Sequence, residues 1–362
     1  MSEIPATLFG LVKAYSPSGQ EQPAVDFLVK RMQALNFTQA FADEAGNAVG
    51  IMGSGVQQIV LLGHIDTVPG EIPVRMEFAS TTGESPVLFG RGSVDAKGPL
   101  AAFVDAVAST GPLVGFQFIV IGAVGEEQDS PGAQFVASRY HPKFAIIGEP
   151  SRWDRLTLGY KGSAWARITF RRSIRHTAGQ GENACEAAVK GWETFSNWAA
   201  VFNADRPRAF DQVLPTLRGM DSGSDGFEEW ASLQIGTRLP LDFPPEKWYA
   251  ELYKIPGVAK TSDIVIEPVG FPIAAYQGEK NTSLVRAFLA GIRSVGGQPG
   301  FVLKTGTADL NIVAPVWGCP AAAYGPGDSA LDHTPNEHIS LDEFKRSISV
   351  LQFVLKQLCL RT

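Results

Sequence analysis

Three apolar runs of strand length, each followed closely by a histidine or a glutamate, constrain the fold of this chain most strongly. They lie at residues 58–62, 120–124 and 144–147, just before His64, the Glu126-Glu127 pair and Glu149. In open α/β sheets, ligands bind in the crevice outside the carboxyl ends of the strands. The repeated arrangement therefore predicts one site, assembled from several loops at the same edge of a buried sheet.

Segments with helical spacing alternate with strand-like segments at both ends of the chain. This alternation predicts an α/β domain with a mixed, mostly parallel sheet flanked by helices. The predicted helices are residues 7–15, 20–35, 98–109, 134–139, 183–201, 245–252, 282–295 and 341–358. The predicted strands are residues 48–52, 59–63, 116–124, 144–147, 157–171, 233–238, 263–267 and 321–324.

The character of the sequence changes in the middle of the chain. Between residues 158 and 272 the strand-like segments alternate apolar and polar residues, which is typical of an antiparallel sheet with one solvated face. We therefore expect an inserted α+β domain with a small antiparallel sheet and two helices over residues 158–272. Residues 1–157 and 273–362 then form the α/β domain.

Composition limits the class of protein. The chain has 362 residues, of which 44% are hydrophobic and 19% charged, which suits a globular protein of about two domains. The net charge of −6 and the lack of a basic run argue against nucleic acid as a partner. We find no apolar run of about 18 residues and no secretory signal, so we expect a cytoplasmic protein without a membrane partner. The three cysteines lie too far apart to suggest a disulfide framework or a thiolate zinc site.

Glu126 and Glu127 stand side by side after an apolar run. Two adjacent carboxylates at the end of a buried strand repel each other and resist loss of water. A multivalent cation would explain them, although a Glu-Glu pair taken alone also fits the solvated start of a loop. His64 and Asp66 would project to the same side of their strand, because side chains alternate with a period of two.

Two glycine-rich turns extend this pattern. Residues 90–98 carry Asp95 in a turn before a helix, and residues 325–328 precede His333. Glycine permits the unusual dihedral angles of a close approach to a ligand. Taken alone, the first turn could equally be a plain connection between a strand and a helix.

In their order along the chain, residues 64–66, 90–98, 126–127, 148–150 and 333–334 resemble the metal-site segments of a known family. This is the family of two-zinc amidohydrolases that includes succinyl-diaminopimelate desuccinylase, acetylornithine deacetylase and aminoacylase. The resemblance covers nearly the whole chain. It implies a catalytic domain like that of the zinc peptidases, an inserted lid or dimerisation domain, and hydrolysis of an amide that releases an amine.

The resemblance also implies a set of metal ligands. His64 and Glu149 would be terminal ligands of one zinc ion, Glu127 and His333 those of a second, and Asp95 would bridge both. Imidazole and carboxylate groups suit zinc, and one carboxylate can span two ions about 3.5 to 4 Å apart. The same ligand set tolerates cobalt or manganese.

Three further residues match catalytic positions of the family. Asp66 would hydrogen-bond the imidazole of His64 and fix its tautomer. Glu126 would be the general base that takes a proton from water and passes it to the leaving amine. His176 resembles a histidine of the inserted domain that reaches the site of the neighbouring subunit and stabilises an oxyanion, which implies an active homodimer.

Arg238, Lys304 and Gly306 match positions of the substrate pocket, where a cation would bind a substrate carboxylate. Arginine also serves domain packing, so Arg238 has this second interpretation. Residues 304–311 and 324–329 resemble the branch that releases lysine or ornithine from the C-terminal glutamate of a small acidic amino-group carrier protein. The loop departs from the family pattern at Ala308, where serine or threonine is usual.

Other activities stay open at this point. Acetylornithine deacetylase and succinyl-diaminopimelate desuccinylase act on small acyl amino acids in the same family, and an aminopeptidase or a non-catalytic metal-binding protein could share the metal core. Glu126 argues against a non-catalytic protein. Arg171, Arg172 and Arg175 cluster beside His176 and would either attract an acidic carrier or guard the solvated edge of a strand.

Overall fold

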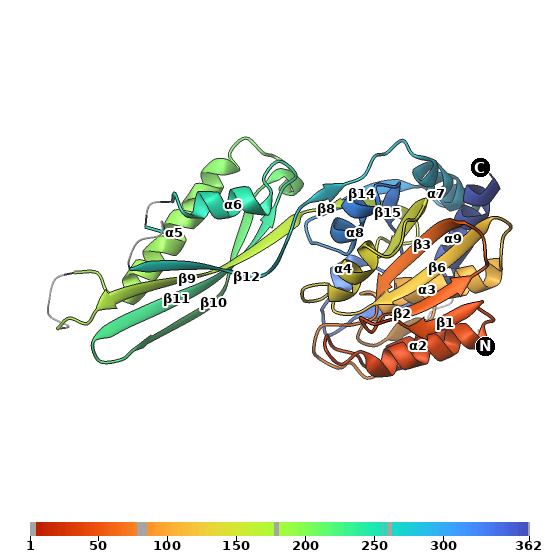
Figure 1. The fold of residues 1–362 in the computed structure, drawn as a ribbon, viewed down its shortest axis with the longest axis horizontal. Helices are drawn as coiled ribbons and strands as arrows, with labels where there is room; N and C mark the ends of the chain where they lie inside the picture. The colour runs from red at the N-terminus through yellow and green to blue at the C-terminus, as the bar shows by residue number, and fades with distance from the viewer. Residues whose placement is uncertain (1–4, 78–84, 177–180, 256, 259–262, 361–362) are drawn as a thin grey trace. The chain divides into compact units, whose positions relative to one another are not determined.

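The computed structural model describes residues 5–77, 85–176, 181–255, 257–258 and 263–360 (Figure 1). The chain divides into two compact units. The first unit comprises Met1–Gly159, Gly278–Leu303 and Ala308–Thr362, and the second comprises Tyr160–Gln277 and Lys304–Thr307.

The sheet of the first unit is mixed, with parallel strands at its centre. Its strands follow the order β1-β2-β6-β3-β7-β15-β8, and β14 also pairs with β8. β6, β3, β7 and β15 run parallel to one another, whereas β1, β2 and β8 pair antiparallel to their neighbours. The bounds are β1 (Gln39–Ala42), β2 (Ala48–Met52), β3 (Gln57–His64), β6 (Phe116–Ala123), β7 (Phe144–Gly148), β8 (Arg155–Tyr160), β14 (Gly300–Lys304) and β15 (Ala321–Ala323). The predicted α/β class with a mixed, mostly parallel sheet is confirmed.

Helices pack against this sheet and enclose its core (Figure 1). The Ala-rich helix α3 is buried along most of its length, because its small residues allow close packing against the sheet and against α1 and α9. The helices of the first unit are α1 (Ala6–Lys13), α2 (Gln22–Ala34), α3 (Lys97–Thr110), α4 (Pro131–Ala137), α7 (Ser283–Ser294), α8 (Leu310–Trp317), α9 (Leu341–Leu360) and the short η2 (Ser329–Leu331). Within the described residues, no helix combines the length and apolarity needed to cross a membrane.

A second, small antiparallel sheet of the first unit joins distant parts of the chain. It has the order β16-β5-β4, formed by β4 (Arg75–Glu77), β5 (Val87–Phe89) and β16 (His338–Ser340). Pairing of β16 with β5 brings Glu337 next to the glycine-rich turn that follows β5, where the backbone N–H of Gly90 donates to its carbonyl oxygen at 3.3 Å. This contact positions the turn that carries Asp95.

The second unit has an antiparallel sheet with the order β10-β11-β9-β12, as expected from the alternating sequence. Its strands are β9 (Gly162–Ser173), β10 (Leu214–Ser224), β11 (Glu228–Leu239) and β12 (Ile264–Ile273), and its helices are α5 (Ala184–Phe202) and α6 (Pro245–Leu252). η1 (Ala209–Asp211) precedes β10, and β13 (Tyr276–Gln277) ends the insertion. One face of the sheet packs against α5 and α6 through buried residues such as Phe170, Leu233 and Trp248.

The prediction of one strand over residues 157–171 is wrong. The structure divides this segment at Lys161 into β8 and β9, which belong to different sheets. Lys161 is buried, and its ammonium group donates to the carbonyl oxygens of Ala209 at 3.1 Å and Phe210 at 3.0 Å. Next to it, a Cβ on Gly162 would lie 2.5 Å from the carbonyl oxygen of Ile273, so the close backbone approach requires glycine.

Candidate active site

His64 and Asp66 lie at the carboxyl end of β3, where the strand leaves the core. Nδ1 of His64 faces Asp66, at 3.0 Å from its carbonyl oxygen and 3.4 Å from Oδ1. Asp66 also accepts hydrogen bonds from the backbone N–H groups of Glu126 and Glu127, each at 3.1 Å, and from the Ser18 hydroxyl at 2.6 Å. Asp66 therefore joins the end of β3 to the two glutamates and directs Nε2 of His64 away from itself.

Asp95 is held in place by Glu337. Oε1 of Glu337 accepts from the backbone N–H groups of Val94 at 2.9 Å and Asp95 at 3.1 Å, while Oε2 forms an ion pair with Arg91 at 2.9 Å. Glu337 is not among the residues predicted from the sequence, because its partners lie more than 240 positions away and nothing in the local sequence marks it. Its burial and its bonds to the Asp95 loop assign it a supporting role.

Two imidazoles face the carboxylate of Asp95, one at each oxygen. Nε2 of His64 lies 3.3 Å from Oδ1, and Nε2 of His333 lies 3.1 Å from Oδ2 and 3.0 Å from Oε1 of Glu127. Ligand atoms of His64, Asp95 and Glu127 all lie within 4.8 Å of one another. The structure thus brings four of the predicted metal ligands into one cluster.

Glu149, the remaining predicted ligand, follows β7 and is 7% exposed. Its charge contributes to raising the pKa of Glu126, which places it in the same electrostatic environment. Glu149 therefore lies near Glu126 in the first unit, as its position after a neighbouring strand predicts.

The titration behaviour of the cluster reflects its mutual hydrogen bonds. Burial lowers the pKa of His64, but its contacts with Asp66 and Asp95 outweigh burial and raise it well above 6.5. Contacts with Asp95 and Glu127 raise the pKa of His333 to about 10. Burial opposes ionisation of Asp95, yet the two histidines hold its pKa below the usual value. Without another cation, protons on the imidazoles supply the positive charge that these acids need.

Glu126 behaves differently from the ligand acids. Burial raises its pKa well above the usual value; the charge of His64 opposes this, and the negative charges of Glu149, Asp309 and Glu127 add to it. A carboxyl group with a raised pKa can accept a proton and release it again near neutral pH. Glu126 therefore has the electrostatic setting of a general base.

The donor set fits divalent metal ions. Imidazole nitrogen and carboxylate oxygen are ligands that zinc prefers, and they converge here without a thiolate. Asp95 presents one oxygen to each histidine, which is the arrangement needed for a carboxylate shared by two ions. A cation at this position would also relieve the repulsion between the clustered acids.

The predicted residues of the second unit form two separate groups. Nη1 of Arg238 donates to the Thr307 hydroxyl at 2.8 Å, directly after Gly306, and Nζ of Lys304 lies 5.9 Å from the ring centroid of Tyr160. Arg238 pairs with Ser163 at the start of β9, whereas His176 is exposed beyond its end at Ser173. Roughly ten residues of extended strand, or about 33 Å, separate the two ends, so one chain does not bring His176 to Arg238.

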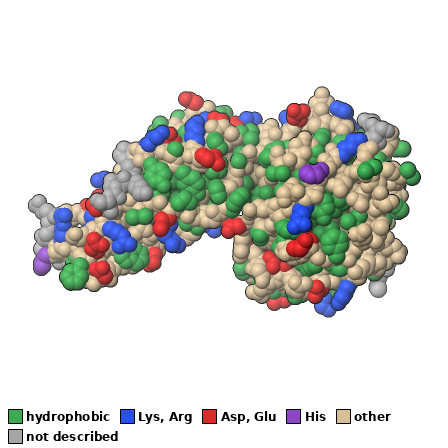
Figure 2. Space-filling view, in the orientation of Figure 1, with side chains coloured by type: hydrophobic (Ala, Val, Ile, Leu, Met, Phe, Trp, Pro, Cys, Tyr) green, Lys and Arg blue, Asp and Glu red, His purple; other side chains and the backbone are tan. Residues whose placement is uncertain are grey.

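The three arginines next to His176 are partly compensated by acids. Arg171 lies 3.9 Å from Glu228, and Arg172 lies 3.2 Å from Glu182. The face in Figure 2 likewise shows acidic and basic side chains interspersed over each unit. β9 lies between β11 and β12 in the sheet, so Arg171 and Arg172 do not guard a sheet edge; their contacts favour the interpretation that they are solvated surface charges paired with acids.

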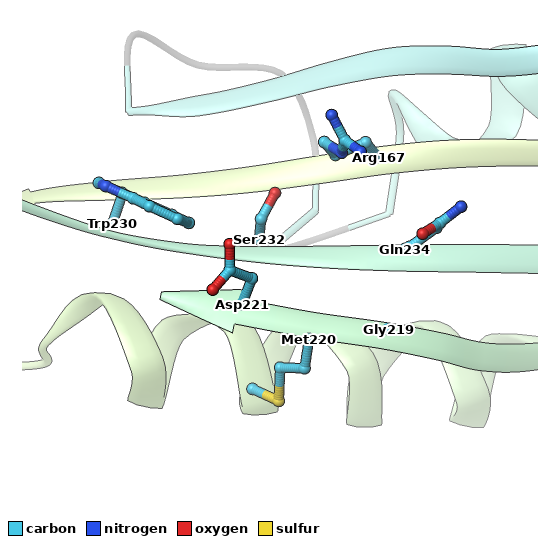
Figure 3. Close-up of a pocket in the computed structure, with 7 residues that line it drawn as sticks. All are labelled: Arg167, Gly219, Met220, Asp221, Trp230, Ser232 and Gln234. Carbon is cyan, nitrogen blue, oxygen red and sulfur yellow. The ribbon is translucent and has the colours of Figure 1, made fainter. Parts of the chain in front are cut away.

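The open face of the second unit's sheet also carries a hollow of about 370 Å³ (Figure 3). Its lining residues come from β9, β10 and β11, and none of them is a predicted site residue. They are Arg167, Gly219, Met220, Asp221, Trp230, Ser232 and Gln234. The hollow is therefore separate from the groups described above.

The pattern of peptidase family M20/M25/M40 matches residues 60–357, and the chain belongs to this family of metal-dependent hydrolases. Among curated proteins, the LysW-lysine hydrolase of Deinococcus radiodurans is 43% identical over 95% of this chain and 93% of its own length. A putative LysW-lysine/LysW-ornithine hydrolase of Thermococcus kodakarensis is 39% identical over 96% of this chain and 90% of its own length. The expected family and the expected enzyme class are confirmed.

Solved structures support the same fold at lower sequence identity. A tripeptidase from Staphylococcus aureus superposes with a TM-score of 0.78 at 18% identity, covering 98% of this chain and 97% of its own. An M20 metallo-carboxypeptidase from Sulfolobus solfataricus superposes with a TM-score of 0.76 at 17% identity, covering 99% of this chain and all of its own. Both likenesses show the fold alone.

Proposed function

We propose that this enzyme hydrolyses the amide between lysine, or ornithine, and the C-terminal glutamate of a small acidic amino-group carrier protein. The observation that carries the proposal is the identity of 43% to a LysW-lysine hydrolase over nearly the full length of both chains. The cluster of His64, Asp95, Glu127 and His333, with Glu126 beside it, supports hydrolysis by the same chemistry.

Two zinc ions are the proposed cofactors, with cobalt or manganese as substitutes. His64 and Glu149 would hold one ion, Glu127 and His333 the other, and Asp95 both. When bound, the metals would polarise the amide carbonyl and make water more acidic. Asp66 keeps His64 oriented through its Nδ1 contact.

Glu126 performs the proton transfer in this proposal. Its carboxylate takes a proton from the attacking water and delivers it to the nitrogen of the leaving amine, so that the amide bond breaks as the amine departs. The raised pKa of Glu126, caused first by burial, supports this role. The backbone N–H groups of Glu126 and Glu127 both donate to Asp66, which anchors the turn that carries the two carboxylates.

The second unit would supply groups for the substrate. Arg238, with Lys304 and Gly306 in its vicinity, would bind a substrate carboxylate, and its bond to Thr307 supports a fixed orientation. His176 would act on the site of a second subunit by stabilising the oxyanion, which is supported by its position at the other end of β9 from Arg238. The working enzyme is then a homodimer of the cytoplasm.

Product analysis with a panel of amides tests the substrate. Zinc-loaded enzyme is incubated with acetylornithine, succinyl-diaminopimelate, an unblocked dipeptide, and carrier protein carrying lysine or ornithine on its C-terminal glutamate. The proposal expects free lysine or ornithine from the carrier conjugates and little product from the others. Faster turnover of a small acyl amino acid or of the dipeptide would contradict it.

A further inference from the structure

Asp309 is a buried acid of the first unit. Its side chain is 1% exposed, and neither carboxylate oxygen has a hydrogen-bond partner among the described residues. An ionised carboxylate is costly to bury without donors, and native proteins pair such groups or place them beside a cation. A nearby positive charge would therefore offset the cost of burying the ionised carboxylate of Asp309.

The position of Asp309 in the chain suggests an ordinary role that its side chain does not perform. An aspartate directly before an apolar helix is typical of an N-cap. Asp309 occupies the N-cap of α8, but its side chain makes no capping hydrogen bond. The hydroxyl of Ser130 lies near enough to favour the ionised form, yet neither oxygen of Asp309 completes a hydrogen bond with any residue that the structure describes.

The charge of Asp309 interacts with residues of the metal cluster. Burial raises the pKa of Asp309 to about 7; the charge of His64 opposes this, and the charge of Asp66 adds to it. Asp309 in turn contributes to raising the pKa of Glu126. Its carboxylate thus interacts electrostatically with the cluster, although it is not part of the close group of His64, Asp95 and Glu127.

We propose that Asp309 is a positioning residue whose buried charge strengthens the binding of divalent cations at this cluster without being a ligand. A negative charge in a poorly solvated interior attracts a doubly charged ion over several ångströms. Because both oxygens are shielded from solvent, a distant electrostatic action fits Asp309 better than contact with a substrate. This role rests on the proposed metal centre but not on the identity of the substrate.

Zinc binding by the metal-free protein tests this role directly. Titration against a chromophoric chelator, at neutral pH and low salt, gives the zinc affinity of the wild type and of Asp309→Asn, which keeps the shape and removes the charge. We expect affinity to fall by about 10- to 100-fold, the usual range for partners outside the ligand set. Asp129→Asn, which removes an exposed charge from the loop after Glu127, should bind like the wild type.

The melting temperature of the metal-free protein separates this role from a structural one. Asp309→Asn and Asp309→Leu both remove an uncompensated buried charge, so the melting temperature of each metal-free variant should equal or exceed that of the metal-free wild type. Leucine has an outline similar to that of aspartate and no polar side-chain atoms. Unchanged zinc affinity with a higher KM would overturn the role and assign Asp309 to the substrate. Unchanged affinity with a lower melting temperature, or failure of both variants to fold, would assign Asp309 to the fold. A wild type that binds no zinc would overturn the metal centre itself, whereas zinc binding with activity on another amide would overturn only the proposed substrate.

Discussion

The two units of the chain place their acidic side chains in different surroundings. In the first unit, Asp309 is buried and Glu126 is half-buried near other acids, and loss of solvation raises the pKa of both. In the second unit, the charged side chains near the surface pair with opposite charges, as Arg206 does with Asp242 at 2.7 Å and Arg172 with Glu182 at 3.2 Å. The second unit balances its own charge, whereas the first requires a cation.

This difference indicates which parts of the molecule contribute to its stability and which contribute to its chemistry. The core of the second unit is an apolar layer between a sheet and two helices, and its surface ion pairs are worth little energy in water. The first unit has a larger apolar core that holds an acidic cluster at the strand ends. Stability of the apolar core then offsets the repulsion within the cluster until metal binds.

The largest expected effect concerns proton transfer in the first unit. Replacement of Glu126 by glutamine should lower kcat by about 10²- to 10⁴-fold, because the general base is lost, while the metal content stays unchanged. Activity assays combined with elemental analysis of the purified protein measure both quantities. Glu127→Gln is the matched control and should lose metal. Equal metal loss in the two variants would refute the division of roles between the adjacent glutamates.

A smaller effect is expected from replacement of Asp66, which contacts Nδ1 of the predicted ligand His64. Asp66→Asn weakens the contact that fixes Nδ1 of His64 and also changes an acceptor of two backbone N–H groups. Zinc affinity should fall by about 10- to 100-fold, as measured by competition with a chelator. An affinity equal to that of the wild type would show that the backbone carbonyl of Asp66 suffices to orient His64.

The metal-free protein should lose stability as pH rises. Its folded state raises the pKa of His64 well above 6.5 and that of His333 to about 10, so these groups bind more protons when folded. Their stabilising contribution is complete below pH 6.5 and is lost as pH rises through about 10. Melting curves in the presence of a chelator should therefore shift down by a few degrees across this window.

A variant that lacks one of these two histidines provides the control for the pH experiment. His333→Gln should show a weaker pH dependence than the wild type in the same buffers, because it removes one of the two raised pKa values. Identical slopes in the two proteins would mean that other groups govern stability in this range.

The smallest effect is expected on the second unit. Arg172→Gln removes a surface ion pair with Glu182 and should change the free energy of unfolding by less than about 1 kcal/mol, as measured by urea denaturation.

Reversal of the charges of Arg171, Arg172 and Arg175 tests whether these arginines assist the encounter with an acidic carrier protein. Slower turnover of the carrier conjugate, with unchanged turnover of a small amide, would assign these arginines to docking in spite of their acid partners.

Periodicity predicted most of the regular elements. The bounds predicted for residues 245–252 agree with α6, and those for 48–52 agree with β2, since apolar and amphipathic segments carry strong local signals. Short strands such as β4, β5 and β16 escaped prediction because three residues carry too little pattern. The division of residues 157–171 at Lys161 also escaped, since it depends on tertiary contacts of that lysine with η1.

The site was predicted unevenly for a similar reason. His64 and Glu149 follow strong strand signals, so their convergence at one sheet edge follows from α/β topology. Asp95 and His333 lie in irregular turns, and their assignment depended on resemblance to a family. Glu337 was missed because its partners are distant in the chain. Asp309 was noted only as part of the loop at residues 304–311, since its burial is not visible in the neighbouring residues.

The central claim is that the acids of the first unit are matched to two bound cations. X-ray diffraction from crystals of the zinc-loaded enzyme, recorded on both sides of the zinc absorption edge, locates the ions without assumptions about activity. We predict two anomalous peaks per chain, one beside His64 and Glu149 and one beside Glu127 and His333, with Asp95 between them. A single peak, or zinc bound away from Asp95, would contradict it.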